Sequence, residues 1–331
     1  MDHYKRSSLN CFVSNSFDRL THKRGDSTWI QERLLDPSTG IIPVWNLKNL
    51  FRKDSSTHAL VLPSTEIHYL LPAANSVTLL GEQTDRIYFA VDFPGQETAA
   101  PPVLDNNGFF SDLRAMGPII DCCEGALLAY ARAMSYWHST HRFCGNCGKP
   151  TTSTQAGHMR VCSNAGCGQQ HFPRTDPAII VLVTNGERAL LGRQAAWPKH
   201  MYSAIAGFVE PGESIEAAVV REVSEEAGMK VNNIHYHSSQ PWPFPCSIML
   251  GFTADTQDKE IRMNDSELED ARWFSTGGLK SAIADGSLKL PSAISIAYRL
   301  IEDWFDSVTM GSLKGEIETP VYSNAPRIGT Q

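Results

Sequence analysis

The segment from Gly207 to Met229 carries glutamates at a spacing that could perform chemistry. Its sequence is GFVEPGESIEAAVVREVSEEAGM, and Glu222, Glu225 and Glu226 stand within five residues. On a helix, positions i, i+3 and i+4 share one face. Carboxylates this close repel one another, whereas hard divalent cations prefer oxygen ligands. The spacing therefore indicates either a divalent-metal site or a solvated acidic face.

Local signals place these glutamates on a helix. Ser214 is of the type favoured at an N-cap, and Gly228 is a typical residue for a helix stop. The predicted helix ends at Ala227, and its opposite flank offers Val219 and Val223 for burial against a core.

Eight cysteines are present, and four of them form two pairs at metal-ligand spacing. Cys144 and Cys147 form C-x2-C, and Cys162 and Cys167 form C-x4-C. Two such knuckles are typical of tetrahedral zinc, with disulfides or unrelated thiols as the alternative. Because four protein ligands leave no open position, the predicted Zn²⁺ is structural rather than catalytic.

The elements that must position these groups can be read from periodicity and turn signals. We expect an N-terminal α+β domain over residues 1–124, a connector helix and zinc ribbon over 125–173, an α/β catalytic domain over 174–308 and a loose tail over 309–331. The predicted strands are Ala59–Leu62, Val77–Leu80, Arg86–Asp92, the buried strand Ala178–Thr184, and segments around NIHYHSS, SIMLGFTAD and ARWF. The predicted helices include Trp29–Leu35, Glu124–His138 and Ala293–Val308.

Composition and charge exclude several classes of protein. The chain has 331 residues, 42% of them hydrophobic, and a net charge of -7, which argues against gripping nucleic acid by bulk charge. The longest apolar run, Ala178–Val183, is too short to span a bilayer. Neither a signal peptide nor a peroxisomal C-terminal signal is recognisable, so a cytoplasmic location is expected.

The glutamate segment resembles the Nudix box, G-x5-E-x7-R-E-U-x-E-E-x-G-U, where U is a bulky aliphatic residue. The residues that fill its positions in register are Gly207, Glu213, Arg221, Glu222, Val223, Glu225, Glu226, Gly228 and Met229. The resemblance implies a Nudix α/β/α sandwich around a mixed sheet, hydrolysis of a nucleoside diphosphate linked to another group, and catalytic Mg²⁺ or Mn²⁺.

A second motif, SQPWPFP at Ser239–Pro245, together with the upstream cysteines is similar to the NADH pyrophosphatase branch of this family. That resemblance implies cleavage of NADH or NAD⁺ to nicotinamide mononucleotide and AMP, removal of NAD caps from RNA in some members, and a homodimer. From the residues alone, alternating prolines hold a rigid segment that presents Trp242 and Phe244 for stacking, or they stiffen a core loop.

The resemblance also implies roles for individual residues. Glu222 and Glu226 are expected to bind the catalytic metal, Glu225 to be a ligand or the base, and Arg221 to orient a glutamate. Glu267 matches a distal ligand, and Ala206 is expected to offer its carbonyl. Phe172 and Phe208 are expected to sandwich the substrate ring from opposite subunits. The other expected substrate-binding residues are Gln240, Pro241, Trp242, Pro243, Phe244, Pro245, Ser247 and Ala297.

Three hypotheses for function remain open at this point: an NAD(H) diphosphatase, an RNA cap-removing hydrolase that uses the same site, and a zinc-ribbon module that binds nucleic acid or protein beside an inactive Nudix fold. No glutamate of the box is lost, which disfavours the third. The basic residues near the ribbon are too scattered in sequence to predict a nucleic-acid groove. The sequence leaves open the preferred substrate, the activating ion and the role of the N-terminal domain.

Overall fold

The computed structural model describes residues 2–13, 17–54, 58–95, 104, 108–263 and 267–316. The chain divides into two compact units. Unit 1 comprises Met1–Cys11, Asp176–Gln240 and Ile248–Gln331, and unit 2 comprises Phe12–Thr175 and Pro241–Ser247. The chain therefore passes from one unit to the other more than once.

A six-stranded sheet forms the centre of unit 1, with strand order β13-β14-β10-β11-β15 and β12 paired to β10. The strands are β10 (Asp176–Asn185), β11 (Arg188–Arg193), β12 (Ile205–Phe208), β13 (Asn232–Trp242), β14 (Ser247–Asp255) and β15 (Asp270–Ser275). Strand β11 runs antiparallel to both β10 and β15. Gly186 and Glu187 form the turn from β10 into β11, and Gly186 has a φ of 59°.

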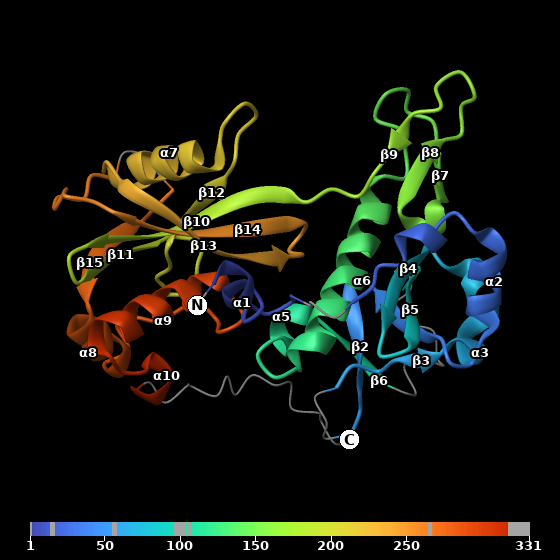
Figure 1. The fold of residues 1–331 in the computed structure, drawn as a ribbon, viewed down its shortest axis with the longest axis horizontal. Helices are drawn as coiled ribbons and strands as arrows, with labels where there is room; N and C mark the ends of the chain where they lie inside the picture. The colour runs from blue at the N-terminus through green and yellow to red at the C-terminus, as the bar shows by residue number, and fades with distance from the viewer. Residues whose placement is uncertain are drawn as a thin grey trace. The chain divides into compact units, whose positions relative to one another are not determined.

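Helices cover both faces of this sheet because the apolar run of β10 is buried on both sides. Ile179 and Val181 pack in the core that includes α7 (Ile215–Ala227), whereas Ile180 and Leu182 pack in the core that includes α8 (Thr276–Ala284) and α9 (Ile296–Thr309). Figure 1 shows α7 on one side of the sheet and α8 and α9 on the other. The predicted α/β/α sandwich is confirmed.

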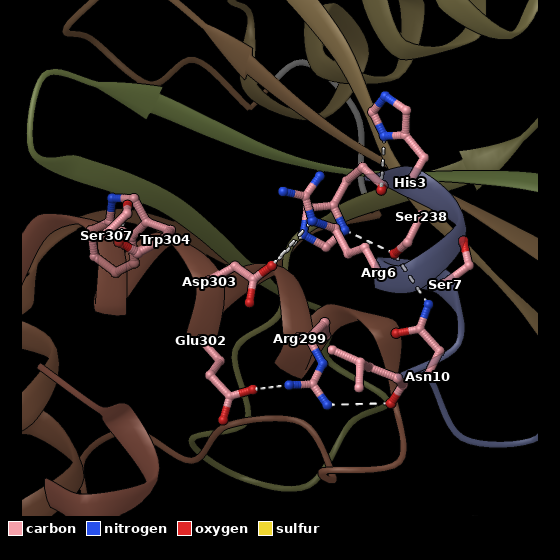
Figure 2. Close-up of polar contacts among 12 residues, drawn as sticks. His3, Arg6, Ser7, Asn10, Ser238, Arg299, Glu302, Asp303, Trp304 and Ser307 are labelled. Carbon is pink, nitrogen blue, oxygen red and sulfur yellow. Dashed lines mark hydrogen bonds and ion pairs between the residues drawn. The ribbon is translucent and has the colours of Figure 1, made fainter. Parts of the chain in front are cut away.

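The N-terminal segment Met1–Cys11 packs on unit 1 although the chain that follows it belongs to unit 2. It contains the short helix α1 (His3–Ser7). The Asn10 amide donates to the Ser238 hydroxyl (3.1 Å) and to the Ser239 carbonyl (2.9 Å) of β13 (Figure 2). The Arg6 guanidinium lies 3.5 Å from the carboxylate of Asp303 in α9. The same carboxylate lies 2.8 Å from the His237 ring of β13. The segment is therefore anchored to β13 and α9.

Unit 2 contains a mixed six-stranded sheet of order β4-β5-β1-β2-β6, with β3 paired to β1. Its strands are β1 (Gly40–Trp45), β2 (Lys48–Arg52), β3 (Leu62–Pro63), β4 (Ser76–Gln83), β5 (Arg86–Phe93) and β6 (Gly108–Ser111). Strands β1 and β5 are parallel, and the 19-residue helix α6 (Cys122–Thr140) packs against β1, β2, β4 and β5. Helix α2 (Ser27–Leu35) contributes Leu34 to the core of this sheet.

Some strand predictions for unit 2 are wrong or missing. Strand β1 and strand β2 are not predicted, and the predicted strand Ala59–Leu62 is wrong. Ala59 forms only an isolated bridge with Phe51, and the strand of that region begins at Leu62. Strands β4 and β5, and helices α2 and α6, are confirmed with boundaries within a few residues.

Three features complete the description of the fold. Within the predicted tail, α10 (Leu313–Glu316) packs against α9 with Leu313 buried, while residues 317–331 lie outside the described residues. Two shorter helices, α3 (Ser64–Ile67) and α5 (Leu113–Met116), belong to unit 2. Among the described residues, no helix has both the length and the apolar content needed to cross a membrane.

Candidate active site

Helix α7 presents the predicted acidic face, and its ends are those expected from the sequence. The Ser214 hydroxyl accepts a hydrogen bond from the Ala217 amide (3.1 Å), and Gly228 ends the helix in the left-handed region at φ 67°. Val219 and Val223 are fully buried against β10 and its neighbours. Burial of this flank fixes the rotation of the helix and hence the direction of its glutamates.

Arg221 joins three carboxylates and a backbone carbonyl. Its guanidinium donates to Glu213 (2.8 and 3.0 Å), to Glu222 (2.8 Å) and to Glu225 (2.9 Å). It also donates to the carbonyl of Phe208 at 2.8 Å, which links α7 to the end of β12. Charge-assisted bonds of this kind hold side chains in one orientation. Glu213 fills a position of the box, yet its role as the second anchor of Arg221 becomes apparent only from the structure.

Glu222 lies directly against the backbone of β12. A Cβ added at Gly207 would come within 1.8 Å of the Glu222 carboxylate, a separation that no real contact allows. Any larger residue at this position would displace the Glu222 carboxylate from its place beside β12. The neighbouring residue, Ala206, pairs with Ile180 of β10. The carboxylate of Glu222 is thus held beside the Ala206–Gly207 backbone.

Burial and charge distinguish the glutamates from a solvated face. Glu222 and Glu226 are 7% and 2% exposed, whereas Glu225 is exposed to solvent. Burial raises the pKa of Glu222, hydrogen bonding to Arg221 opposes that change, and the charges of Glu225 and Glu267 raise it further. Glu267 acts on Glu222 although they are far apart in sequence. A bound cation would relieve this accumulated negative charge.

The donor set fits a hard divalent cation. Among the described residues, only the four cysteines bring three or more ligand atoms within 4.8 Å of one another, so the carboxylates do not form a closed cage. Mg²⁺ characteristically binds to one or two carboxylates and retains water and substrate phosphates as its other ligands. The site residues Glu222, Glu225, Glu226 and Glu267, with the carbonyl of Ala206, offer oxygen ligands of this kind.

The two predicted stacking residues are both exposed. Phe208 is 60% exposed at the end of β12 in unit 1, and Phe172 is 59% exposed after β9 in unit 2. Phe208 is therefore not a core residue. The Phe208 carbonyl accepts a hydrogen bond from Arg221, so the backbone that carries the Phe208 ring lies next to the carboxylates that Arg221 binds.

The boundary between the two units falls inside the SQPWPFP motif, so that Gln240 belongs to unit 1 and Pro241 to unit 2. The tip of the β13–β14 hairpin belongs to unit 2, where the Phe244 ring lies 4.5 Å from the Arg114 guanidinium and 4.7 Å from that of Arg132. Arg132 also donates to the Pro243 carbonyl. The rings of Trp242 and Phe244 meet at 5.0 Å. In unit 2 these aromatic side chains therefore pack on protein groups; Pro241 and Pro245 are exposed.

Three other predicted substrate contacts are buried. Gln240 has no exposed surface, and its amide donates to the carbonyls of Ile294 (2.7 Å) and Cys11 (3.0 Å) and accepts from the Ile296 amide (2.8 Å). Ala297 is 2% exposed in the core around α9, and Ser247 is 8% exposed. These side chains hold the fold together, which argues against direct substrate contact by Gln240 and Ala297.

The four predicted zinc ligands converge in unit 2. The sulfur atoms of Cys144, Cys147, Cys162 and Cys167 all lie within 4.8 Å of one another, as a tetrahedral thiolate site requires. The Asn146 amide donates to the Cys167 sulfur at 3.5 Å and, together with the Gln169 backbone amide and the neighbouring thiols, lowers the pKa of Cys167 to about 6. The geometry and the donor chemistry fit a structural Zn²⁺, which would be held by thiolates alone.

Comparison with known families agrees with this geometry. Residues 174–290 match the NUDIX domain, residues 139–172 match the NADH pyrophosphatase zinc ribbon domain, and residues 38–137 match the NADH pyrophosphatase-like rudimentary NUDIX domain. The chain therefore belongs to the Nudix family. Two of the three matched domains are those of NADH pyrophosphatases, and this places the chain in that branch of the family.

Curated relatives cover part of the chain. It is 45% identical over 203 residues to the NAD-capped RNA hydrolase NudC of Mycobacterium bovis (strain BCG / Pasteur 1173P2), which is 58% of this chain and 64% of that protein. It is 41% identical over 192 residues to the NAD-capped RNA hydrolase NUDT12 of Macaca fascicularis, 55% of this chain and 42% of that protein. The chain thus spans less than two thirds of either relative.

A solved structure is also similar to part of the chain. The NUDIX hydrolase from Nitrosomonas europaea is 19% identical, with a TM-score of 0.42, over 52% of this chain and 94% of that one.

Proposed function

We propose that the chain hydrolyses the pyrophosphate bond of NADH or NAD⁺ to give nicotinamide mononucleotide and AMP. The observation that carries this proposal is the Arg221 network, which fixes an intact set of Nudix carboxylates beside the β12 backbone. The relatives named as NAD-capped RNA hydrolases support the choice of an NAD-type substrate. Removal of NAD caps from RNA by the same site is the second activity we propose.

The residues of this chain would share the work of the reaction. Mg²⁺ or Mn²⁺ held by Glu222, Glu226 and Glu267 would neutralise the pyrophosphate and lower the pKa of the attacking water. Arg221 keeps Glu222 and Glu225 in fixed orientations. Glu225, which is exposed whereas Glu222 and Glu226 are buried, is suited to accept the proton of the water as it attacks phosphorus. Phe208 would stack on one ring of the dinucleotide.

A homodimer with shared active sites belongs to this proposal. Phe208 and Phe172 are both exposed aromatic residues, as a ring sandwich built from two copies of the chain would need. Mixing two impaired variants, Glu226→Gln with low kcat and Phe172→Ala with raised KM, tests the idea at an NADH concentration well below the KM of Phe172→Ala. In exchanged dimers one of the two sites would regain both wild-type residues, so activity should rise above the sum of the two variants; a mixture with only the summed activity would argue against shared sites.

The function is tested by Glu226→Gln with Glu216→Gln as its control, because both residues lie on α7 and Glu216 is exposed on the first turn. NADH, NAD⁺, ADP-ribose, diadenosine polyphosphates and NAD-capped RNA are assayed with Mg²⁺ and with Mn²⁺. We expect Glu226→Gln to reduce kcat at least about 10²-fold, as loss of one preorganised electrostatic contact does. The control should retain activity. Equal turnover in the two variants would sink the assignment of Glu226.

The remaining expectations stay predictions. These are the preference among NADH, NAD⁺ and capped RNA, the identity of the ion, the cytoplasmic location and the division of the chain into four consecutive segments.

A further inference from the structure

The zinc ribbon lies in the longest stretch of the chain without an acidic residue. None of residues 125–175 is Asp or Glu, although the whole chain holds 36 of them and has a net charge of -7. The same stretch contains Arg142, Lys149 and Arg174, all exposed. A region of opposite sign on an acidic protein is suited to an anionic partner.

The register of the ribbon sheet gathers one set of residues on one face. Its strands are β7 (Thr151–Thr154), β8 (Met159–Cys162) and β9 (Gln170–His171). Thr152 pairs with Val161, which pairs with Gln170, and Phe143 pairs with Pro150 at the edge of β7. Because side chains alternate along a strand, Pro150 shares the face of Thr152, and Phe172 shares that of Gln170. We call this set, Phe143, Pro150, Thr152, Val161, Gln170 and Phe172, the ribbon face.

The opposite side of the same sheet packs on α6 at Arg160, whereas Ser153 on that side is exposed. Ser153 pairs with Arg160, and Arg160 is buried with its guanidinium 2.9 Å from the His138 ring of α6. On the ribbon face, by contrast, Phe143 is 61% exposed and Phe172 is 59% exposed. Thr152 and Gln170 are exposed as well. Two large aromatic rings are thus presented to solvent by a small sheet whose other side packs on the protein.

Exposed basic residues flank the ribbon face in sequence, although alternation along the strands directs Arg142 and Lys149 to the other side of the sheet. Arg142 and Lys149 directly adjoin Phe143 and Pro150 in sequence, and Arg174 follows Phe172 by two residues. Burial lowers the pKa of His141, and the charges of His171 and Arg174 lower it further, so the start and the end of the ribbon share one electrostatic environment. A zinc–thiolate cluster would carry a formal charge of about −2, which offsets part of the positive charge of the ribbon. Stacking on the aromatic rings, rather than bulk charge, must therefore supply most of the affinity for an anionic partner.

We propose that the ribbon face binds the single-stranded RNA that follows the NAD cap, with its exposed rings stacking on bases and with no acidic residue in the surrounding stretch 125–175 to repel the phosphates. This inference rests on the proposed removal of NAD caps. Sheet faces with exposed aromatic residues bind unpaired bases in several RNA-binding folds. Phe172, the residue proposed to contact the cap, belongs to the ribbon face, so the cap and the first nucleotides would occupy continuous protein surface.

The sharpest test compares two neighbouring substitutions that change the net charge equally. Thr152→Glu places a carboxylate on the ribbon face, whereas Ser153→Glu places it on the opposite side of the same strand. Binding of a short, labelled, uncapped single-stranded RNA is measured for the full-length protein. We expect Thr152→Glu to weaken RNA binding about tenfold or more, as loss of one stacked base contact does, while Ser153→Glu keeps wild-type affinity. Equal affinities in the two variants would overturn the proposal.

A second pair of variants tests stacking without adding charge. Phe143→Ala should weaken RNA binding roughly ten- to hundredfold. Tyr69→Ala, which removes an aromatic residue that is 58% exposed elsewhere in unit 2, should leave it unchanged. An effect of equal size in both variants, or a protein partner that competes for the ribbon face while RNA does not bind, would contradict an RNA surface.

Hydrolysis of free NADH separates this inference from the proposed function. Thr152→Glu and Phe143→Ala should cleave NADH at the wild-type rate and lose activity only on NAD-capped RNA, as a raised KM. If the wild-type protein cleaves no NAD-type substrate, the proposed function fails, and binding of the uncapped RNA still decides whether the ribbon face binds RNA. Equal loss on NADH and on capped RNA would indicate damage to the fold and would count against the inference.

Discussion

Gly207 of β12 lies beside the Glu222 carboxylate of α7, and its missing side chain makes room for that carboxylate. The atom that an added Cβ would meet is the far end of a flexible side chain, not backbone. The carboxylate can therefore move aside at small cost in stability, but it then leaves the position that Arg221 holds.

We predict that Gly207→Ala melts within a few degrees of the wild-type protein but loses at least about 10²-fold in kcat, the scale of one lost electrostatic contact. The concentration of Mg²⁺ needed for half-maximal activity should rise. Gly277→Ala in α8 is the control, because no atom lies within 4 Å of its added Cβ. Wild-type turnover in Gly207→Ala would show that the position of Glu222 does not limit the reaction.

Phe208 allows a separation of binding from stability. Because its ring is 60% exposed, Phe208→Ala should hardly change the melting temperature. The KM for NADH should rise about ten- to hundredfold, corresponding to one lost base stack of about 1–3 kcal/mol, with a smaller change in kcat. Phe252→Ala, at a residue 4% exposed in the core, should show the reverse pattern of lower stability and similar KM. An unchanged KM in Phe208→Ala would refute stacking.

Among the elements, α7 could be predicted from the sequence almost completely, because its cap, its stop and its buried flank are all local signals. Strand β1 could not, since Pro43 interrupts its apolar run and proline argues against a central strand. The role of Gln240 could not be predicted either, because its partners at Cys11 and Ile294 are distant in sequence. Contacts that form only in the folded chain leave no local pattern.

A buried histidine network joins the ribbon to α6 and β4. His138 lies 2.9 Å from both the Gly157 carbonyl and the Arg160 guanidinium, and His158 lies 2.7 Å from the Leu79 carbonyl. Burial lowers the pKa of each histidine to about 4, and Arg160 adds to the effect at His138. The arrangement suits a neutral His138 that donates to the carbonyl and accepts from the guanidinium.

This network predicts a dependence of stability on pH. A histidine whose folded pKa is depressed is neutral in the folded protein but takes up a proton when unfolded, so the unfolded state gains as pH falls. We expect unit 2 to lose stability between about pH 6.5 and pH 4, by up to about 3 kcal/mol for each histidine. In His138→Gln the change in unfolding free energy across this window should be smaller than in the wild-type protein. The same pH dependence in both proteins would contradict the prediction.

At the scale of the whole molecule, the chain changes units at Cys11–Phe12, Thr175–Asp176, Gln240–Pro241 and Ser247–Ile248. The sequence suggests consecutive domains, because local patterns cannot show that the first residues pack on an element more than two hundred positions later. Asn10 is the clearest example, being 3% exposed and bonded to Ser238 and Ser239.

We predict that Asn10→Ala destabilises unit 1 by about 1–3 kcal/mol, the cost of leaving buried polar groups without a partner. Denaturant unfolding followed by a probe in unit 1 measures the change. Asn232→Ala, at an exposed position of β13, should change stability by less than about 0.5 kcal/mol. An unaltered unfolding midpoint for Asn10→Ala would show that the N-terminal segment contributes nothing to unit 1.

The anchoring of α1 on β13 and α9 limits how such a gene could be rearranged in evolution. A DNA fragment that encodes residues 174–290, the stretch matched by the NUDIX domain, would carry the carboxylates of α7 but neither α1 nor α9. Its product would expose the His237 ring and the Ser238 hydroxyl, both buried in the intact chain. Recombination at the boundary of the family domain would therefore produce a fragment with exposed core residues. We expect selection to favour inheritance of α1 and α9 together with the matched domain.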